Sequence, residues 1–417
     1  MKMAWLCNSP IRAVNEALGR GGFVNSGWLD GAFNDVMLAG GHELVIFYPQ
    51  STSVETERSA GRGFDAYGFA WKIGGVEERK AAMTLFANVL KSEKPDVVHI
   101  FGTENEFGEL MARASEDCGL LDRTVVSIQG LVSVYSRQFM PGFSDRWLKR
   151  CTLSDFKNRC SLYEQRESYR RRGQSEERLI ASVHHIIGRT RWDEGCCRLL
   201  NPDIEYYHVG ESLRPEFYEA SPKRDAESHK LYFSQGCKPI KAMYQLVEAL
   251  PAVVRRVPDV KVVVAGSNGL RTGPLRGTSY DRYLAERMDS LGIHDRFEFV
   301  GLLGPKEVIA HMASCSAFVS TSSIENSPNS MGEAMMMGLP SVATFVGGVP
   351  DIAEHGKEAL LVPFNETELL ADAIIRVLTD ASLAESLADA GRKRALQNHL
   401  RNANCDALLG AYTHIAS

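Results

Sequence analysis

Two glutamates with seven residues between them, Glu325 and Glu333, mark the stretch of this sequence best suited to chemistry. The β-branched run Ala317–Thr321 predicts a strand before Glu325, and Glu333 falls in the first turn of an Ala/Met-rich segment that predicts a helix. At such a junction, unpaired backbone N–H groups and the positive end of the helix attract an anion. Carboxylates on both sides can hold sugar hydroxyls through charge-assisted hydrogen bonds. The pattern therefore indicates a nucleotide-sugar site.

The same residues also allow a purely structural interpretation. Ser330 and Glu333 fit a capping box, in which both side chains only tie down the start of the helix. The order of the surrounding features favours a binding site. A Ser-Pro-Asn-Ser loop separates Glu325 from the helix, a Gly-Leu-Pro sequence leads into the next strand, and Gly347 and Gly348 follow that strand.

This segment resembles the C-terminal donor-binding module of the retaining GT-B glycosyltransferases of family 4, the glycosyl transferases group 1. The resemblance implies that Glu325 contacts hydroxyls of the donor sugar and that Glu333 contacts the ribose. It also implies that main-chain amides meet the diphosphate near Asn329, Ser330 and Met331. Relatives often have Phe-Gly where this chain has Ser327-Pro328, which leaves open how this loop contacts the sugar.

A lysine at the start of the first helix of the second half can reach a phosphate as a mobile point charge. Lys241 matches the lysine of a family pattern that often reads Arg, a few residues, then Lys-Gly; Ala242 replaces the glycine. The arginine position holds Gln235 or Gly236, and Lys238 is the candidate for the missing charge. The alternative for Lys241 is a solvated lysine at a helix start.

Two further donor-side positions follow from the resemblance. The main chain at Gly301–Leu303 is expected to lie along the edge of the nucleobase, which places Leu303 beside the base. Gly27, after a loop that contains Gly21-Gly22, keeps one glycine of the pair that relatives place near the donor phosphates. A small-residue turn lets the backbone approach a ligand closely, although tight-turn geometry alone would also explain Gly27.

The acceptor side is expected near the ends of strands in the first half. Trp28 opens the first long helix, and Phe101 stands where many relatives have a histidine close to the transferred sugar. Gln129 also replaces a frequent histidine, and its amide can both donate to and accept from a sugar hydroxyl. Arg189 or Arg191 could meet an acceptor or a phosphate, or could simply pair with Asp193 and Glu194. His99 is interpreted as a buried histidine whose hydrogen bonds are satisfied within the protein.

Composition excludes several classes of protein. The 417 residues are 44% hydrophobic and 24% charged, which is ordinary for a globular protein of two domains. A net charge of −5 does not indicate a nucleic-acid-binding protein, and no apolar run approaches the length of a membrane-spanning helix. The first apolar run is too short for a signal peptide. Nine scattered cysteines without metal-ligand spacing indicate free thiols and a cytoplasmic location.

Alternation of short apolar runs with helical patterns predicts an α/β protein of two doubly wound, Rossmann-like domains that face each other across a cleft, the GT-B arrangement. We expect an acceptor-side domain over 1–212, a donor-binding domain over 213–398, and a terminal helix over 399–417 that packs back on the first domain. A helical insertion over about 143–181, rich in arginine, is expected to pack on the N-terminal domain. The alternative is a basic face for an anionic lipid-linked acceptor or a membrane surface.

The resemblance implies a retaining glycosyltransferase that needs no metal and no cofactor. A nucleotide-diphosphate donor, with UDP favoured, would pass its sugar to a saccharide or lipid-linked saccharide in cell-surface polysaccharide synthesis. The leaving phosphate takes the proton, with Lys241 on the diphosphate and Glu325 on the sugar. A dinucleotide-dependent oxidoreductase would need a Gly-x-Gly-x-x-Gly motif after the first strand, and the sequence does not contain one there. A nucleotide-sugar epimerase and a non-catalytic binding protein of the same fold remain alternatives.

Overall fold

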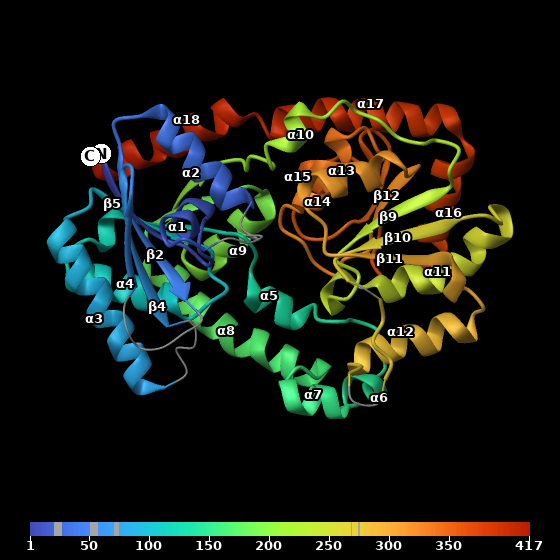
Figure 1. Cartoon of the computed structure of the whole chain (residues 1–417), viewed down its shortest axis with the longest axis horizontal. Helices are drawn as coiled ribbons and strands as arrows, with labels where there is room; N and C mark the ends of the chain where they lie inside the picture. Colours follow the sequence, from blue (N-terminus) through green and yellow to red (C-terminus); the bar gives the residue numbers. More distant parts are fainter. Residues whose placement is uncertain (21–26, 51–56, 71–74, 268, 274–275) are drawn as a thin grey trace. The chain divides into compact units, whose positions relative to one another are not determined.

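The computed structural model describes residues 1–20, 27–50, 57–70, 75–267, 269–273 and 276–417. Contacts divide the chain into two compact units (Figure 1). The first unit contains Met1–Val134, Arg171–Arg214 and His399–Ser417, and the second contains Tyr135–Arg170 and Pro215–Asn398.

Within the described part of the chain, the first unit is built on an eight-stranded sheet with neighbour order β3-β4-β2-β1-β5-β6-β7-β8. Neighbouring strands are parallel, apart from the antiparallel pair β3 and β4. Strands buried on both faces are near-continuous apolar runs, as parallel sheets require. The strands of this sheet are β1 (Lys2–Leu6), β2 (Glu43–Gln50), β3 (Glu57–Gly61), β4 (Phe64–Ala70), β5 (Val97–Phe101), β6 (Thr124–Ser127), β7 (His185–Gly188) and β8 (Glu205–His208).

Helices cover both faces of this sheet. Side chains alternate along β2, so Ile46 and Tyr48 join the core beneath α2 and α18, whereas Phe47 packs edge-on against Phe86 of α3. The helices of this unit are α1 (Arg12–Ala17), α2 (Gly27–Ala39), α3 (Val76–Glu93), α4 (Phe107–Asp117), η1 (Leu121–Arg123), α5 (Val132–Arg137), α8 (Leu162–Ser182), α9 (Arg191–Leu200) and α18 (Arg401–Ala416).

The C-terminal helix α18 belongs to the first unit. It packs beside α2 (Figure 1), and its Leu408, Tyr412 and Ile415 are buried in the same core as Met3 and Trp5. Apolar side chains of the terminal helix therefore pack on the sheet that the start of the sequence forms. None of the described helices combines the length and the apolar character needed to cross a membrane.

Among the residues described, the second unit holds a six-stranded, all-parallel sheet with neighbour order β11-β10-β9-β12-β13-β14. The chain runs outward from β9 to β11, then returns to the other side of β9 and runs outward again to β14. The order thus reverses between β9 and β12, and ligands of open α/β sheets bind outside the carboxyl ends of strands at such a point. The strands are β9 (Lys230–Ser234), β10 (Lys261–Ala265), β11 (Phe297–Gly301), β12 (Ala317–Ser320), β13 (Ser341–Thr344) and β14 (Ala359–Val362).

Helices again cover both faces of the second sheet. Helices α11, α12 and α16 enclose the larger apolar core, and α14 packs on α17. The helices are α6 (Asp145–Leu148), α7 (Leu153–Asn158), α10 (Glu216–Glu219), η2 (Pro239–Lys241), α11 (Met243–Arg256), α12 (Ser279–Ser290), η3 (His294–Arg296), α13 (Pro305–Ala313), α14 (Asn329–Met336), α15 (Val349–Ile352), α16 (Thr367–Thr379) and α17 (Ala381–Asn398).

The helical insertion differs from the expectation that 143–181 packs on the N-terminal domain. Its part up to Arg170 belongs to the second unit, and the division passes through α8. The reason lies in its contacts: the Phe143 ring packs 4.5 Å from the Tyr283 ring, and the Thr152 hydroxyl donates to the Gly277 carbonyl at 2.8 Å. Buried Asp155 also accepts from the Ser279 amide at 2.9 Å, at the start of α12.

Candidate functional site

The second unit places Glu325 and Glu333 on either side of the start of α14. Glu325 lies in the loop after β12, Glu333 lies one turn into the helix, and both are buried, with 8% and 7% of their surfaces exposed. The residue before the helix is Pro328, and no side chain caps this helix. The capping-box interpretation of Ser330 and Glu333 is therefore wrong, because Ser330 lies inside the helix.

The first turn of α14 has backbone amides to offer. The Met331 and Gly332 amides donate to the Pro328 carbonyl, at 2.9 and 3.3 Å. Within the part of the chain that the structure describes, the amides of Asn329 and Ser330 meet no acceptor. The Asn329 side-chain carbonyl is likewise buried without a partner there. A helix start with unpaired amides favours an anion.

Lys241 meets Glu325 at the reversal point of the sheet. Lys241 ends the short 3₁₀ turn after β9, and its ammonium forms an ion pair with Glu325 Oε1. The Ser322 hydroxyl donates to the same oxygen at 2.6 Å. Both side chains are mostly buried, at 20% and 10% exposed. Lys241 is therefore not a freely solvated lysine at a helix start.

Backbone hydrogen bonds hold the lysine turn against the glutamate loop. The Ser323 amide donates to the Ile240 carbonyl at 3.0 Å, and the Thr321 hydroxyl donates to the Ala242 carbonyl at 2.9 Å. Ala242 has a φ of 48°, in the left-handed region that disfavours residues with a Cβ. This conformation gives a physical reason why relatives often have glycine at this position.

Lys238 adds a second positive charge beside the pair. Desolvation and, next, repulsion from Lys241 lower its pKa, while Glu325 opposes the shift. Within the described residues its ammonium forms no ion pair. Two ammonium groups near one carboxylate leave an excess of positive charge that an additional anion would neutralise.

Gly347 permits the close approach that positions Glu325. Its φ is +51°, and a Cβ added there would lie 1.9 Å from the Glu325 carbonyl oxygen. The Gly348 amide donates to that same oxygen at 3.0 Å. The glycine pair is thus a turn requirement that also fixes the loop carrying Glu325.

Gly347→Ala is expected to lower the free energy of unfolding by about 3 kcal/mol, because steric overlap adds to the strain of a positive φ. Gly356→Ala is the matched control: φ there is +78°, but no atom lies within 4 Å of the added Cβ, so about 1 kcal/mol is expected. Urea denaturation followed by circular dichroism measures both. Equal losses in the two variants would show that the contact with Glu325 is irrelevant.

The remaining donor-side positions are less informative. Leu303 is half-buried after β11, next to Leu302, which is 80% exposed. Gly301 has a φ of 85° and accepts from the Gly266 amide at 2.7 Å, which shapes the turn there. Gly27 is the first residue of α2, and the preceding residues 21–26, which include Gly21, Gly22 and Ser26, lie outside the described residues.

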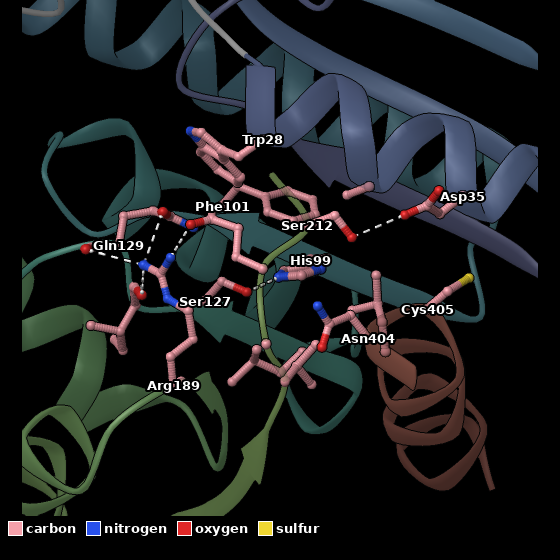
Figure 2. A pocket seen from close by; sticks show the side chains of 18 of the residues that line it. Trp28, Asp35, His99, Phe101, Ser127, Gln129, Arg189, Ser212, Asn404 and Cys405 are labelled. Carbon is pink, nitrogen blue, oxygen red and sulfur yellow. Dashed lines mark hydrogen bonds and ion pairs between the residues drawn. The ribbon is translucent and has the colours of Figure 1, made fainter. Parts of the chain in front are cut away.

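The first unit contains a cavity of about 60 Å³ at the carboxyl ends of β5, β6 and β7 (Figure 2). All four predicted acceptor-side residues line it, from four different elements or loops. Helices α2 and α18 supply further walls. The residues that line the cavity include Trp28, His99, Phe101, Gln129, Arg189, Glu211 and Asn404.

Arg189 is committed to contacts within the unit. Its guanidinium forms a buried ion pair with Glu211 and donates to the Gln129 carbonyl and side-chain oxygens, at 3.2 and 3.1 Å (Figure 2). The expected pairing with Asp193 or Glu194 is wrong for the side chain: Asp193 instead accepts from the Arg189 backbone amide at 3.0 Å. Arg189 therefore shapes the pocket and orients Gln129.

His99 is a buried histidine with both ring nitrogens engaged, as the sequence predicts. Nδ1 lies 2.5 Å from the Tyr412 hydroxyl and Nε2 lies 2.5 Å from the Ser127 hydroxyl. Burial lowers the pKa of His99 to about 3, so the ring is neutral at physiological pH. Phe101 stacks on it, with 3.7 Å between ring centroids, and Trp28 packs on Phe101.

Sequence reasoning missed two polar residues of this pocket. Glu211 lies in the loop after β8, and Asn404 lies on α18. Glu211 Oε1 and Asn404 Nδ2 are buried, and neither has a hydrogen-bond partner among the described residues. An unpaired buried polar group costs about 1–3 kcal/mol, so the pocket suits a ligand with hydroxyl groups.

Residues 229–380 match the family model for glycosyl transferases group 1. This range contains Lys241, Glu325, Glu333 and the whole arrangement around α14. This part of the chain is therefore similar to the glycosyl transferases group 1 family. The two parallel-sheet units of the chain correspond to the GT-B fold.

Named relatives are glycosyltransferases as well. The chain is 27% identical over 279 residues to D-inositol 3-phosphate glycosyltransferase of Saccharomonospora viridis, a match that covers 63% of this chain and 62% of the relative. It is 29% identical over 162 residues to GDP-mannose-dependent alpha-(1-6)-phosphatidylinositol monomannoside mannosyltransferase of Mycobacterium tuberculosis, which covers 37% and 40%. The matches thus span less than two thirds of each relative.

A solved structure shares its fold with nearly the whole chain. An Anabaena protein in complex with UDP and glucose superimposes with a TM-score of 0.65 at 16% identity, over 99% of this chain and 100% of that one. Identity at this level shows a common fold.

Proposed function

We propose that this chain transfers a sugar from a nucleotide-diphosphate donor to a hydroxyl of a saccharide acceptor, with retention of configuration at the anomeric carbon. The observation that carries the proposal is the Lys241–Glu325 pair beside the uncapped start of α14. It offers cations and amides for a diphosphate next to a carboxylate for sugar hydroxyls. The match of residues 229–380 to the family model for glycosyl transferases group 1 supports the same reaction class.

In this proposal the amides of Asn329 and Ser330, with Lys238 and Lys241, hold the diphosphate. Glu333, buried one turn further on, is assigned to the ribose hydroxyls, with Leu303 and Met331 near the nucleoside. The amides and Lys241 stabilise the negative charge that grows on the departing diphosphate. Glu325 orients the sugar through its hydroxyls.

Retention follows from how the acceptor hydroxyl would attack. We assign no protein nucleophile: the acceptor approaches from the face that the diphosphate leaves, and the leaving phosphate takes its proton. Lys238 and Lys241 supply positive charge for the diphosphate, so we propose that transfer does not require a metal ion.

The pocket of the first unit is proposed to receive the acceptor or part of the transferred sugar. Gln129, held by Arg189, and the unpaired atoms of Glu211 and Asn404 would bind hydroxyl groups, while Trp28 and Phe101 provide an apolar wall. A nucleotide-sugar epimerase is less well supported, because His99 has both ring nitrogens engaged and is not free to act as an acid or base.

The acceptor is proposed to be a saccharide or lipid-linked saccharide of cell-surface polysaccharide synthesis at the cytoplasmic face of a membrane. Apolar side chains on the insertion support contact with that surface: Leu153 and Phe156 of α7 are 64% and 77% exposed. Lys157 and Arg159 follow Phe156 in sequence and suit anionic headgroups.

UDP is proposed as the nucleotide, with support from the Anabaena structure that binds UDP and glucose. The mycobacterial relative is named for GDP-mannose, which makes GDP the main competitor. A thermal-melt screen of the full chain with UDP, GDP, ADP, dTDP and CMP distinguishes them. The preferred nucleotide at a hundred times its Kd should stabilise the fold by about 2.7 kcal/mol, and the shift should persist in EDTA.

Glu333→Gln is the matching variant, and Glu368→Gln, an exposed glutamate of α16, is the control. The shift should shrink in Glu333→Gln and remain in Glu368→Gln. A shift with the corresponding nucleotide sugar but no turnover with any saccharide would favour the non-catalytic binding protein. Absence of a shift with all five nucleotides would contradict the proposed donor site.

A further inference from the structure

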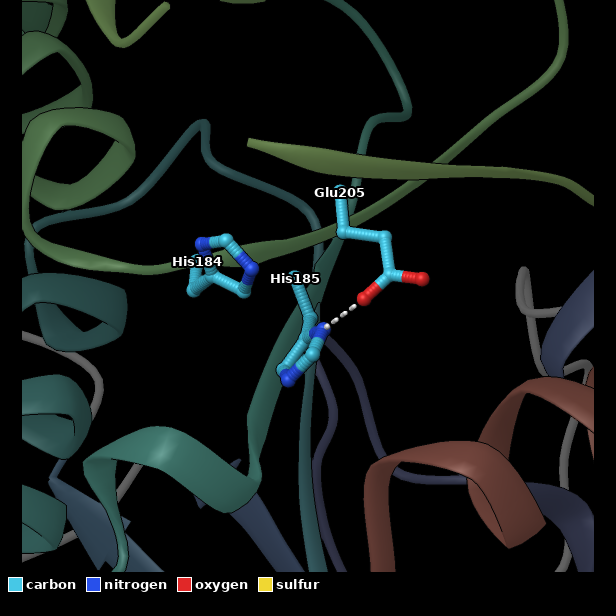
Figure 3. Close-up of side chains that lie close together, drawn as sticks. All are labelled: His184, His185 and Glu205. Carbon is cyan, nitrogen blue, oxygen red and sulfur yellow. Dashed lines mark ion pairs between the residues drawn. The ribbon is translucent and has the colours of Figure 1, made fainter. Parts of the chain in front are cut away.

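Three side chains with metal-binding atoms meet at the amino ends of β7 and β8: His184, His185 and Glu205 (Figure 3). One ligand atom from each lies within 4.8 Å of the others. The backbone fixes this arrangement, since His185 and Glu205 are direct partners in the parallel ladder and the Glu205 amide donates to the His184 carbonyl at 2.8 Å. Neither the proposed transfer reaction nor the pocket uses these residues.

The hydrogen bonds of His185 leave one ring nitrogen available as a ligand. Nε2 lies 3.2 Å from the Asp122 carbonyl oxygen, which can only accept, so Nε2 carries the proton. Nδ1 therefore presents its lone pair, 3.6 Å from Glu205 Oε2. A backbone carbonyl that fixes the outer nitrogen in this way is typical of metal-binding histidines.

Glu205 is held so that one oxygen is available to His185. Its Oε1 lies 3.0 Å from His414 Nε2 of α18, which leaves Oε2 on the side of His185. Tyr207 lies 3.0 Å from His185 Nδ1 through its hydroxyl, a hydrogen bond that an ion would replace. His184 is exposed and forms no side-chain hydrogen bond within the described residues, so its ring is available.

We propose that His184, His185 and Glu205 bind a divalent transition-metal ion of the Zn²⁺ type. Zinc takes imidazole nitrogen and carboxylate oxygen at about 2.0–2.2 Å in a tetrahedron, so its ligand atoms stand about 3.4 Å apart. The 3.6 Å between His185 Nδ1 and Glu205 Oε2 is close to that spacing. Two imidazoles with one carboxylate favour zinc over magnesium or calcium, and the fourth position would hold water.

The ion would be structural, because the site lies at the opposite end of β7 from the pocket. His185 is the first residue of β7 and Gly188, which lines the pocket, is the last. Three residue steps of about 3.3 Å separate the two ends by about 10 Å. Bound metal would link the end of α8 to β7 and β8 and, through the Glu205–His414 pair, to α18. It is expected to stabilise the fold without entering the transfer chemistry.

The test uses the purified full chain titrated with Zn²⁺ by isothermal calorimetry, with Mg²⁺ as the hard-cation control. One equivalent of Zn²⁺ should bind and raise the Tm, and Mg²⁺ should do neither. Substitution by Co²⁺ identifies the ligands, because nine free cysteines could compete. Visible bands of a nitrogen and oxygen site, without a thiolate-to-metal charge-transfer band, are expected.

His184→Ala is the decisive variant, since the side chain is exposed and its loss should leave the fold intact. We expect zinc affinity to fall about tenfold or more, with a similar loss in Glu205→Gln. His208→Ala, at the exposed end of β8, should bind like the unchanged protein. Unchanged affinity in His184→Ala, a thiolate band with Co²⁺, or equal stabilisation by Mg²⁺ would each overturn the proposal.

Discussion

Glu325→Gln should lower kcat/KM for sugar transfer about a thousandfold, yet the variant should bind the free nucleoside diphosphate more tightly than the unchanged protein. The two effects have opposite signs because Glu325 does two things. It accepts hydrogen bonds from sugar hydroxyls in the proposed complex, and it neutralises Lys241 when no donor is bound. The neutral amide of glutamine performs neither role, so Lys241 is then free to bind phosphate.

Nucleotide affinity and turnover should be measured on the same preparation, by calorimetry with the preferred nucleoside diphosphate and with its sugar. The gain in affinity should appear with the nucleoside diphosphate alone. Affinity for the nucleotide sugar should instead fall, because the sugar loses its contact to the carboxylate. Ser322→Ala removes the hydrogen bond to Glu325 Oε1 but keeps the charge of Glu325. It should lower kcat/KM by about tenfold or less. Undiminished transfer by Glu325→Gln would refute the assigned role.

Most of the fold could be predicted because parallel strands leave a strong signal. Every strand of the second sheet is a short apolar run between helical patterns, such as Lys261–Ala265. The pair β3 and β4 was not predicted, because β3 is polar and lies at the edge of the sheet, and because Asp65 and Gly68 interrupt β4. Edge strands need fewer apolar residues, so periodicity detects them poorly.

The candidate site was predictable where local motifs determine it. Lys241 and Glu325 are 84 positions apart, but each follows a strand, and β9 and β12 are neighbours, so their loops meet. Glu211 and Asn404 had no such signal, because a residue after the last strand and one on the terminal helix reach the pocket only through tertiary packing. The insertion was placed on the wrong unit for the same reason: contacts such as Thr152 to Gly277 have no local pattern.

Lys241→Ala should lower kcat about a hundredfold with a small change in nucleotide affinity, whereas Lys238→Ala should mainly weaken nucleotide binding, by about tenfold. The difference follows from their partners before the donor binds. Lys241 is paired with Glu325, so contact with phosphate must replace an existing ion pair and gains most when charge develops on the leaving diphosphate. Lys238 has no ion-pair partner among the described residues, so its attraction for phosphate is the same before and during the reaction.

Single-turnover rates and calorimetric Kd values for both variants separate the two contributions. Lys306→Ala, an exposed lysine of α13 in the same unit, should change neither quantity. Lys241→Arg keeps the charge but not the compact ammonium, and should recover only part of kcat, because a planar guanidinium cannot replace it at the Glu325 oxygen without rearrangement. If Lys241→Ala instead raised Kd as much as it lowered kcat/KM, Lys241 would bind the donor equally in the ground and transition states, and the proposed division between the two lysines would fail.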